Sequence, residues 1–189
     1  LKKALEKNPS NEELRIHYAK LLTDYDRKEA LHQFQLLNVS NPENQEIKYL
    51  LALLYIDQQL PDLAHPKLRD LIASRRFSHD ALFHLGVITE NKGEHRAALH
   101  YYARVTSGRH FLMAVSRSVS LILESYDLSS ARLYLSRLRE TIPDQAIPLF
   151  ELEAQLLVKN NQGKEAINLL TAGLLRNPEN KTLLYARAM

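Results

Sequence analysis

The sequence predicts an all-α protein, a superhelical solenoid of antiparallel helix pairs. Alanine recurs at a nearly constant interval, each time with a large apolar residue four positions later; the alanines are Ala30, Ala64, Ala98, Ala131 and Ala166. Their intervals of 34, 34, 33 and 35 residues are typical of stacked helical repeats. A second small or modest residue precedes each alanine by eleven or twelve positions. No segment of the sequence reads as a β-strand.

Each repeat is predicted to contain two helices. The segments between units contain prolines, which would follow a second helix, and capping residues, which would start the next first helix. The predicted caps are Asn11, Asn44, Asn180 and, in the third unit, Ser78. The predicted units are 1–11 (the end of a truncated repeat), 12–44, 45–78, 79–111, 112–145 (a degenerate repeat), 146–180 and 181–189 (the start of a truncated repeat). Because the chain begins and ends inside a unit, we expect it to come from a longer protein.

The paired small residues predict where the two helices of a unit approach closely, because small side chains bring helix axes together while larger neighbours fill the flanks. The predicted packing residues are Ala19, Ala30, Ala52, Ala64, Gly86, Ala98, Ala131, Ala154 and Ala166.

The composition excludes several classes of site and argues against others. The 189 residues are 45% hydrophobic and 25% charged, and contain no cysteine, which excludes disulfides, thiolate chemistry and cysteine-based zinc sites. A net charge of +3 without a dense basic stripe does not fit the usual nucleic-acid binder. The longest strongly apolar stretch, 49–56, is far too short to span a bilayer, so no transmembrane segment is expected.

No residue pattern indicates catalysis, a metal or a cofactor. Among the eight histidines, the closest helical pairs are five residues apart, which does not place two ligands on one helix face. A phosphate-binding glycine loop and a nucleophile elbow are both missing. Glu153 stands at an apolar packing position; we expect it to pair with a nearby arginine or to face the groove, with a buried carboxylate as the alternative. The sequence therefore predicts a protein that is not an enzyme.

The third unit carries the clearest motif, Leu82-x2-Leu85-Gly86-x2-Thr89, then Gly93 and Ala98-x3-Tyr102. This pattern resembles the tetratricopeptide repeat, and the resemblance covers essentially the whole chain. It departs from the family in lacking tryptophan and in having Glu153 for leucine.

A narrower resemblance rests on short phrases such as Ala81-Leu-Phe-His-Leu-Gly86 and Tyr101-Tyr-Ala-Arg-Val-Thr106. These are similar to proteobacterial tetratricopeptide lipoproteins that include an adaptor for a carboxyl-terminal-processing protease. The resemblance implies a periplasmic or outer-membrane-associated location, with the cytoplasm as the alternative.

In the tetratricopeptide family, the first helix of each unit lines a concave groove. Transferred to this sequence, the resemblance implies a groove formed by Ile16, Lys20, Tyr49, Leu53, Ile56, Phe83, Val87 and Glu90. We call Tyr49, Leu53, Ile56, Phe83 and Val87 the apolar stripe, and expect it to bind an extended peptide or an amphipathic helix. The alternative is that some of these residues belong to the core. Farther along, the groove positions become polar, at Ser116, Ser120, Glu124, Glu151, Gln155 and Lys159.

The sequence thus predicts a non-enzymatic scaffold or adaptor that binds another protein, such as a protease or an envelope assembly factor, in protein quality control of the bacterial cell envelope. Two alternatives stay open. One is a structural scaffold that self-associates end to end, and the other is a helical-repeat RNA-binding module, suggested by a pI of about 9.1. Acidic residues at predicted groove positions, including Glu46 and Asp80, argue against RNA, so no nucleic-acid partner is expected.

Overall fold

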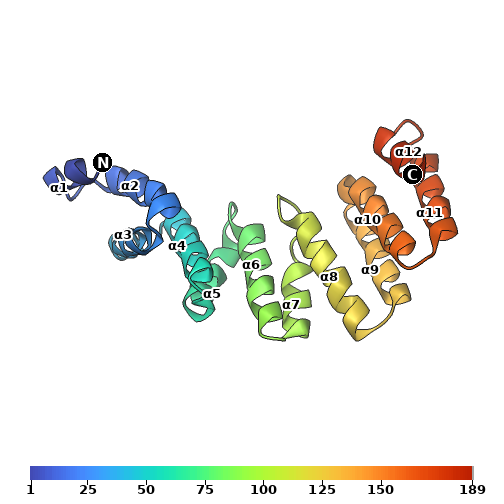
Figure 1. Cartoon of the computed structure of the whole chain (residues 1–189), viewed down its shortest axis with the longest axis horizontal. Helices are drawn as coiled ribbons and strands as arrows, with labels where there is room; N and C mark the ends of the chain where they lie inside the picture. Colours follow the sequence, from blue (N-terminus) through green and yellow to red (C-terminus); the bar gives the residue numbers. More distant parts are fainter. Residues whose placement is uncertain (189) are drawn as a thin grey trace. The chain divides into compact units, whose positions relative to one another are not determined.

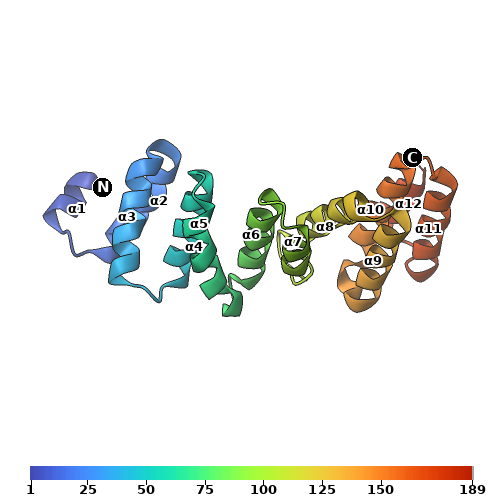
Figure 2. The same ribbon diagram turned by 90° about the horizontal axis from the view of Figure 1, so that it is seen from below.

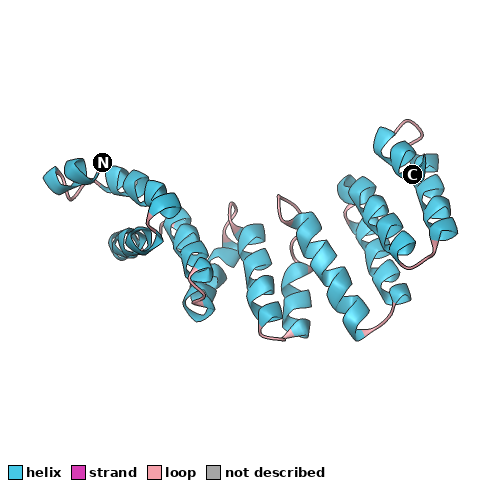
Figure 3. Ribbon diagram, in the orientation of Figure 1, coloured by secondary structure: helices cyan, strands magenta, loops and turns pink. Residues whose placement is uncertain are grey.

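The computed structural model describes residues 1–188, and within them every regular element is a helix (Figure 3). The predicted all-α class is therefore confirmed. The chain divides into two compact units, residues 1–108 and 109–189, here called the N-terminal and C-terminal units.

The N-terminal unit contains three helical hairpins, α2–α3, α4–α5 and α6–α7, preceded by a short α1 (Figure 1). Consecutive hairpins contact each other through α3 with α4 and through α5 with α6, and Figure 2 shows the first two hairpins side by side. The elements are α1 (Lys2–Lys7), α2 (Glu12–Tyr25), α3 (Arg27–Ser40), α4 (Gln45–Asp57), α5 (Pro61–Asp70), the 3-10 helix η1 (Leu71–Ala73), α6 (Ser78–Asn91) and α7 (His95–Tyr102).

The C-terminal unit contains the hairpins α8–α9 and α10–α11, followed by α12. Here α9 packs on α10, and α12 packs on both α11 and α10. The elements are α8 (Phe111–Ser125), α9 (Leu128–Thr141), the 3-10 helix η2 (Pro143–Gln145), α10 (Ala146–Lys159), α11 (Gly163–Arg176) and α12 (Lys181–Ala188). The exact repeat boundaries within the two units remain a prediction.

The turns between hairpins explain where the first helices begin. An Asn-Pro-x-Asn sequence starts at Asn8, Asn41 and Asn177, and these three residues share nearly the same backbone conformation, with φ of −139°, −134° and −142°. The second asparagine of each turn caps the next helix, as predicted. Its side chain accepts a hydrogen bond from the backbone N–H three residues later, at Leu14, Ile47 and Leu183, and so satisfies a donor that the helix leaves free.

The predicted cap at Ser78 is wrong. Helix α6 begins at Ser78, and the residue before it, Phe77, makes no side-chain cap. The 3-10 helix η1 follows α5 here, and the serine after it takes over the hydrogen bonding: Ser74 Oγ accepts the backbone N–H of Phe77 at 3.0 Å and donates to Gln45 Oε1 at 2.7 Å. The serine that accepts a backbone N–H at this junction therefore lies four residues before Ser78, directly after the 3-10 turn.

Each of three turns inside hairpins contains one residue with a left-handed backbone conformation. Gln59 and Asn161 both have φ of 59°, and Gly93 has φ of 75°. In each case the next backbone N–H bonds to a carbonyl five residues earlier: Leu60 to Tyr55, Glu94 to Thr89, and Gln162 to Leu157. This arrangement satisfies the last carbonyls of the first helix and reverses the chain.

All nine predicted packing residues are buried. Gly86 shows why such a position needs a small residue: a Cβ atom built there would lie 2.3 Å from Cε1 of Tyr102 on α7, far inside van der Waals contact. The close approach of α6 and α7 therefore depends on the missing side chain.

Candidate functional site

The two aromatic residues of the apolar stripe lie in the core of the N-terminal unit. Tyr49 is 4% exposed and Phe83 is 7% exposed. The Tyr49 ring stacks on Phe77 with 5.0 Å between centroids, and its hydroxyl lies 3.3 Å from Nε2 of His84. The ring of Phe83 lies 6.0 Å from that of Tyr102. Tyr49 thus contacts α6 through His84, Phe83 joins α6 to α7, and both offer little surface to a partner.

The aliphatic members of the predicted groove retain some surface. Ile16, Leu53 and Ile56 are half-buried and pack against the core cluster of this unit, and Val87 is also half-buried. They come from α2, α4 and α6, the first helices of three consecutive hairpins. What the structure leaves accessible is a narrow aliphatic strip, and a partner-binding role for it stays a prediction.

The charged residues beside this strip neutralise one another. Lys20 on α2 donates to Glu46 on α4 at 2.7 Å, and Arg76 Nη1 lies 3.6 Å from the other Glu46 oxygen. The hydrogen bond from Lys20, followed by the charges of Lys20 and Arg76, outweighs partial burial and lowers the pKa of the Glu46 carboxyl below its ordinary value. Lys20, a predicted groove residue, is thus already engaged within the unit, and Glu90 similarly accepts a hydrogen bond from the Tyr102 hydroxyl.

The C-terminal unit contains a cavity of ≈ 760 Å³ between α10, α11 and α12. Its apolar wall includes Ala154, Val158, Ala166, Ile167 and Leu170. Three of the polar residues that the sequence placed in the later groove, Glu151, Gln155 and Lys159, line the same cavity. The structure therefore adds an apolar wall to a surface predicted to be polar.

Sequence reasoning missed the exposed apolar residues of this cavity. Val158 is 61% exposed and Tyr185 is 68% exposed, and both line the opening. The repeat period could have identified them, because Val158 lies 102 residues after Ile56 and Tyr185 lies 136 residues after Tyr49, close to three and four repeat lengths. The groove predicted from the sequence ended at the polar positions of the fifth unit, Glu151, Gln155 and Lys159.

The borders of the cavity are charged. Lys159 and Arg187 lie on it together with Glu151, and none of the three forms a salt bridge with another residue in the described part of the chain. This differs from the N-terminal unit, where Lys20, Glu46 and Arg76 pair with one another.

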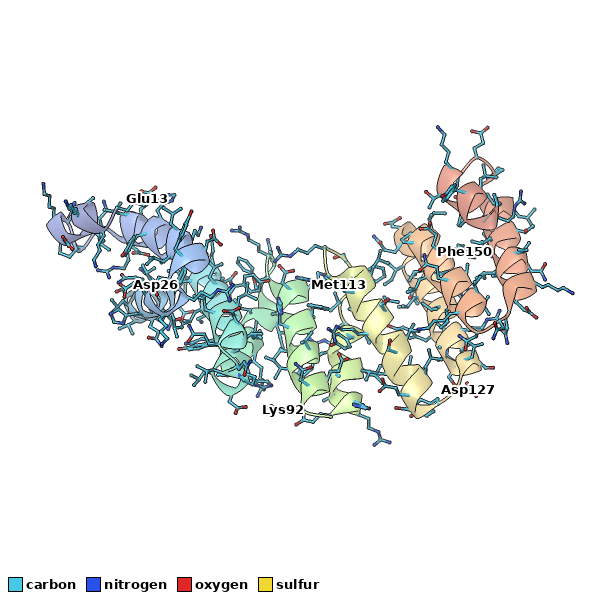
Figure 4. The ribbon with its side chains drawn as sticks, in the orientation of Figure 1. Glu13, Asp26, Lys92, Met113, Asp127 and Phe150 are labelled. Atoms are coloured by element: carbon cyan, nitrogen blue, oxygen red, sulfur yellow. The ribbon has the colours of Figure 1, made fainter. Side chains whose placement is uncertain are left out.

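Glu153 is a buried carboxylate that pairs with two arginines. It accepts a hydrogen bond from Nε of Arg132 at 3.0 Å and another from Nη1 of Arg139, both on α9. The Arg139 guanidinium also lies 4.6 Å from the ring centroid of Phe150 on α10, which Figure 4 labels. The predicted arginine pairing is confirmed, and burial accompanies it. The carboxylate joins α9 to α10 and needs no catalytic explanation.

Over residues 1–188, no three His, Asp or Glu side chains gather closely enough to hold a metal ion. None of the helices in this range is long and apolar enough to cross a bilayer. The N-terminal unit thus presents partly exposed aliphatic side chains beside paired charges, and the C-terminal unit, taken by itself, presents a cavity with an apolar wall.

These hairpins have the fold of tetratricopeptide-repeat structures, and repeat arrays of this kind present extended surfaces on which other molecules can bind. Residues 49–109 match the family described as Tetratricopeptide repeat, whose members are generally not catalytic. Solved structures such as pilF, YrrB and PilW share only 15–16% identity with this chain, so their likeness shows a common fold.

The chain is similar to particular proteins of this fold. It is 36% identical over 109 residues to a TPR repeat-containing protein of Pseudomonas aeruginosa; the match covers 58% of this chain but only 18% of that relative. Among solved structures, it resembles Pseudomonas aeruginosa pilF, with a TM-score of 0.65 at 16% identity over 99% of this chain and 86% of that one. It also resembles YrrB, described as a TPR protein with an unusual peptide-binding site, with a TM-score of 0.59 at 16% identity over 100% and 97% of the two chains.

Proposed function

We propose that this chain is a non-enzymatic adaptor that holds a peptide or helix of a partner protein against its first helices. The observation that carries the proposal is the aliphatic strip of Ile16, Leu53, Ile56 and Val87, which remains partly accessible along α2, α4 and α6. Apolar surface that stays open on several consecutive elements marks interaction sites. Repeat arrays present such surfaces to elongated partners.

Two proteins of similar fold support a peptide-like ligand and a bacterial envelope setting for this proposal. YrrB is described as having an unusual peptide-binding site. A further neighbour, PilW, is described as a widely conserved type IV pilus biogenesis factor and has a TM-score of 0.59 at 15% identity over 97% of this chain and 86% of that one. We therefore propose a partner in the envelope, such as an assembly factor or a protease.

Site-specific photo-crosslinking in the native cells tests the proposal. A benzophenone amino acid replaces Leu53 or Val87 on the aliphatic strip, and in the matched control it replaces Val39, which is exposed on the second helix α3. We expect both strip positions to crosslink to the same protein and Val39 not to do so. Equal adducts from all three positions, or none from the strip in variants that keep their helical circular dichroism, would overturn the adaptor role of this surface.

A further inference from the structure

One repeat position of the second helices, directly after the repeated alanine, packs toward the following hairpin. In α9 it is Arg132, whose Nε donates to Glu153 on the first helix of the next hairpin at 3.0 Å. In α3 it is Leu31, which is half-buried and packs against the core cluster of the N-terminal unit. The residues at this position, in chain order, are Leu31, His65, Leu99, Arg132 and Ile167. Helix α5 therefore carries an ionisable ring at a position that is aliphatic in three of the other four second helices.

His65 is half-buried, and charged groups from two elements surround it. Asp62 and Arg69 lie on α5 itself, about one turn away on either side, and Lys92 and Glu94 come from the turn between α6 and α7. Lys92 Nζ donates to Asp62 Oδ1 at 2.7 Å, so this turn is held against the start of α5. The two carboxylates balance the two cations as long as the histidine is neutral.

The helices that pack on α5 contribute further ionisable side chains, and these bond to other partners. On α4, Lys48 Nζ lies 3.6 Å from Asp70 Oδ2, and Asp57 accepts two hydrogen bonds from α3. On α6, Nε2 of His84 lies 3.3 Å from the hydroxyl of Tyr49. His84 is thus a second histidine of the contact between the second and third hairpins, and an effect of pH must be assigned by substitution at residue 65.

We propose that protonation of His65 weakens the contact between the second and third hairpins, and that acid thereby lowers the affinity of the aliphatic strip for its partner. A proton on this ring places a third cation beside two others and a charge on a half-buried group, and both effects are relieved when the third hairpin moves away from α5. The aliphatic strip crosses this contact, because Leu53 and Ile56 lie on α4 and Val87 lies on α6. The inference rests on the proposed adaptor function and adds its regulation.

The direction of the effect follows from linkage. Burial, followed by the charges of Arg69 and Lys92, lowers the pKa of His65 below 6.5, so the closed contact binds the proton less readily than the open one. The contact is therefore strongest above 6.5 and weakens as the pH falls toward the lowered pKa. Each unit of difference between the two pKa values changes the opening equilibrium by about tenfold.

Hydrogen exchange of the whole chain at pH 7.5 and 5.5, corrected for the intrinsic exchange rate at each pH, tests the switch without any partner. We expect the protection of α6 and of the α6–α7 turn to fall at least about threefold at the lower pH, and the protection of α2 and α3 to change less. His65→Leu, which introduces the residue of the equivalent position in α3, should remove the fall. His100→Leu, at an exposed position of α7, is the matched control and should keep it.

Equal protection of α6 at both pH values in the wild-type chain would overturn the proposal. So would a fall that persists in His65→Leu, because it would belong to another group such as His84.

Photo-crosslinking tests the consequence for binding. With the benzophenone amino acid at Val87, the yield of the adduct in lysates buffered at pH 5.5 should be at least about threefold lower than at pH 7.5, and His65→Leu should abolish this difference. An unchanged yield beside a pH-dependent exchange would overturn the regulation of binding. The absence of adducts at both pH values would instead count against the adaptor role, and the exchange result would stand without it.

Discussion

Gly86 lies against an aromatic ring that cannot move away easily. Tyr102 is 1% exposed, and its hydroxyl donates to Glu90, about one turn after Gly86 on α6. A Cβ atom at residue 86 would meet three atoms of this ring at 2.3–2.9 Å. The ring would have to leave both its packing site and its hydrogen bond, so the glycine sets the distance between α6 and α7.

We therefore predict that Gly86→Ala destabilises the protein. Overpacking costs about 1–3 kcal/mol, and the better helix propensity of alanine returns at most about 1 kcal/mol, so the net loss should reach about 2 kcal/mol. Urea denaturation followed by circular dichroism measures it. Gly163→Ala is the matched control, because a Cβ there meets nothing within 4 Å; an equal loss in the control would show that the Tyr102 contact is not the cause.

At Gln59, replacement by glycine rather than of glycine should be favourable, because this residue carries a side chain where the backbone conformation favours glycine. Its φ of 59° costs an L-residue roughly 1–2 kcal/mol relative to right-handed conformations. Gln59→Gly should raise the free energy of unfolding by about 0.5–1 kcal/mol, after the greater freedom of glycine in the unfolded chain is subtracted. The reciprocal change is Gly93→Ala, at φ of 75° with no atom near its Cβ, which should lower stability. The same sign for both substitutions would contradict this account.

At the scale of an element, the α9–α10 contact depends on a buried charge. Removing the carboxylate leaves Arg139, whose side chain is 11% exposed, without its acceptor, whereas Arg132 at 39% exposure still reaches water; breaking a buried ion pair typically costs about 3–5 kcal/mol, and we place this one at the lower end. We expect Glu153→Ala to cost an amount in this range, whereas the exposed Glu165→Ala on α11 should be nearly neutral. Thermal or urea unfolding gives both values.

A triple variant separates the charge from the packing in this contact. Glu153→Leu combined with Arg132→Met and Arg139→Met removes the whole ion cluster and leaves no buried charge unpaired. Because replacing a complete buried cluster is often neutral or stabilising, the triple variant should recover much of the stability lost in Glu153→Ala. A triple variant as unstable as Glu153→Ala would mean that the hydrogen-bonded geometry, rather than the unpaired charge, is decisive.

Helix α5 brings a pH dependence to the N-terminal unit. Partial burial, with the nearby charges of Arg69 and Lys92, lowers the pKa of His65 below its ordinary value of 6.5. As the pH falls, the unfolded chain therefore binds this proton before the folded one. The stability contributed by neutral His65 is fully present above 6.5 and declines as the pH falls through the interval down to the lowered pKa.

The expected outcome is a urea midpoint that decreases from about pH 7.5 to about pH 5, with a smaller decrease in His65→Gln. The exposed His32 on α3 provides the matched substitution, His32→Gln, which should keep the wild-type slope. If His65→Gln has the same pH slope as wild type, His65 is not the group responsible.

At the scale of the whole molecule, the repeat period predicted the helical class and the buried small residues, because both depend on local spacing. Asn11, Asn44 and Asn180 were likewise predictable as caps, since the same turn recurs around each. The cap predicted at Ser78 was wrong, because the repeat period does not reveal the added 3-10 turn of η1, which changes the start of α6. The candidate site was harder still. Whether Tyr49 faces a groove or the core depends on a helix rotation of one residue, and the cavity beside Tyr185 depends on what packs across three helices.

The burial of Tyr49 and Phe83 in the core changes how these aromatic members of the apolar stripe should be tested. Loss of partner capture after Tyr49→Ala with Phe83→Ala would identify a binding site only if the protein stayed folded. Both side chains are buried, however, at 4% and 7% exposure, and truncating a buried aromatic residue costs about 3–5 kcal/mol each. Their sum is comparable with the whole stability of an ordinary domain, about 5–15 kcal/mol.

We therefore predict that the double variant unfolds much of the N-terminal unit, whereas Leu53→Ser with Val87→Ser, at half-buried positions, loses substantially less stability and retains its helices. Hydrogen exchange read by mass spectrometry distinguishes the two cases, because loss of the α4–α6 contacts should accelerate exchange throughout both helices in the aromatic variant only. Exchange protection that survives the aromatic double substitution would mean that Tyr49 and Phe83 contribute little to folding, and would return them to consideration as direct contacts for a partner.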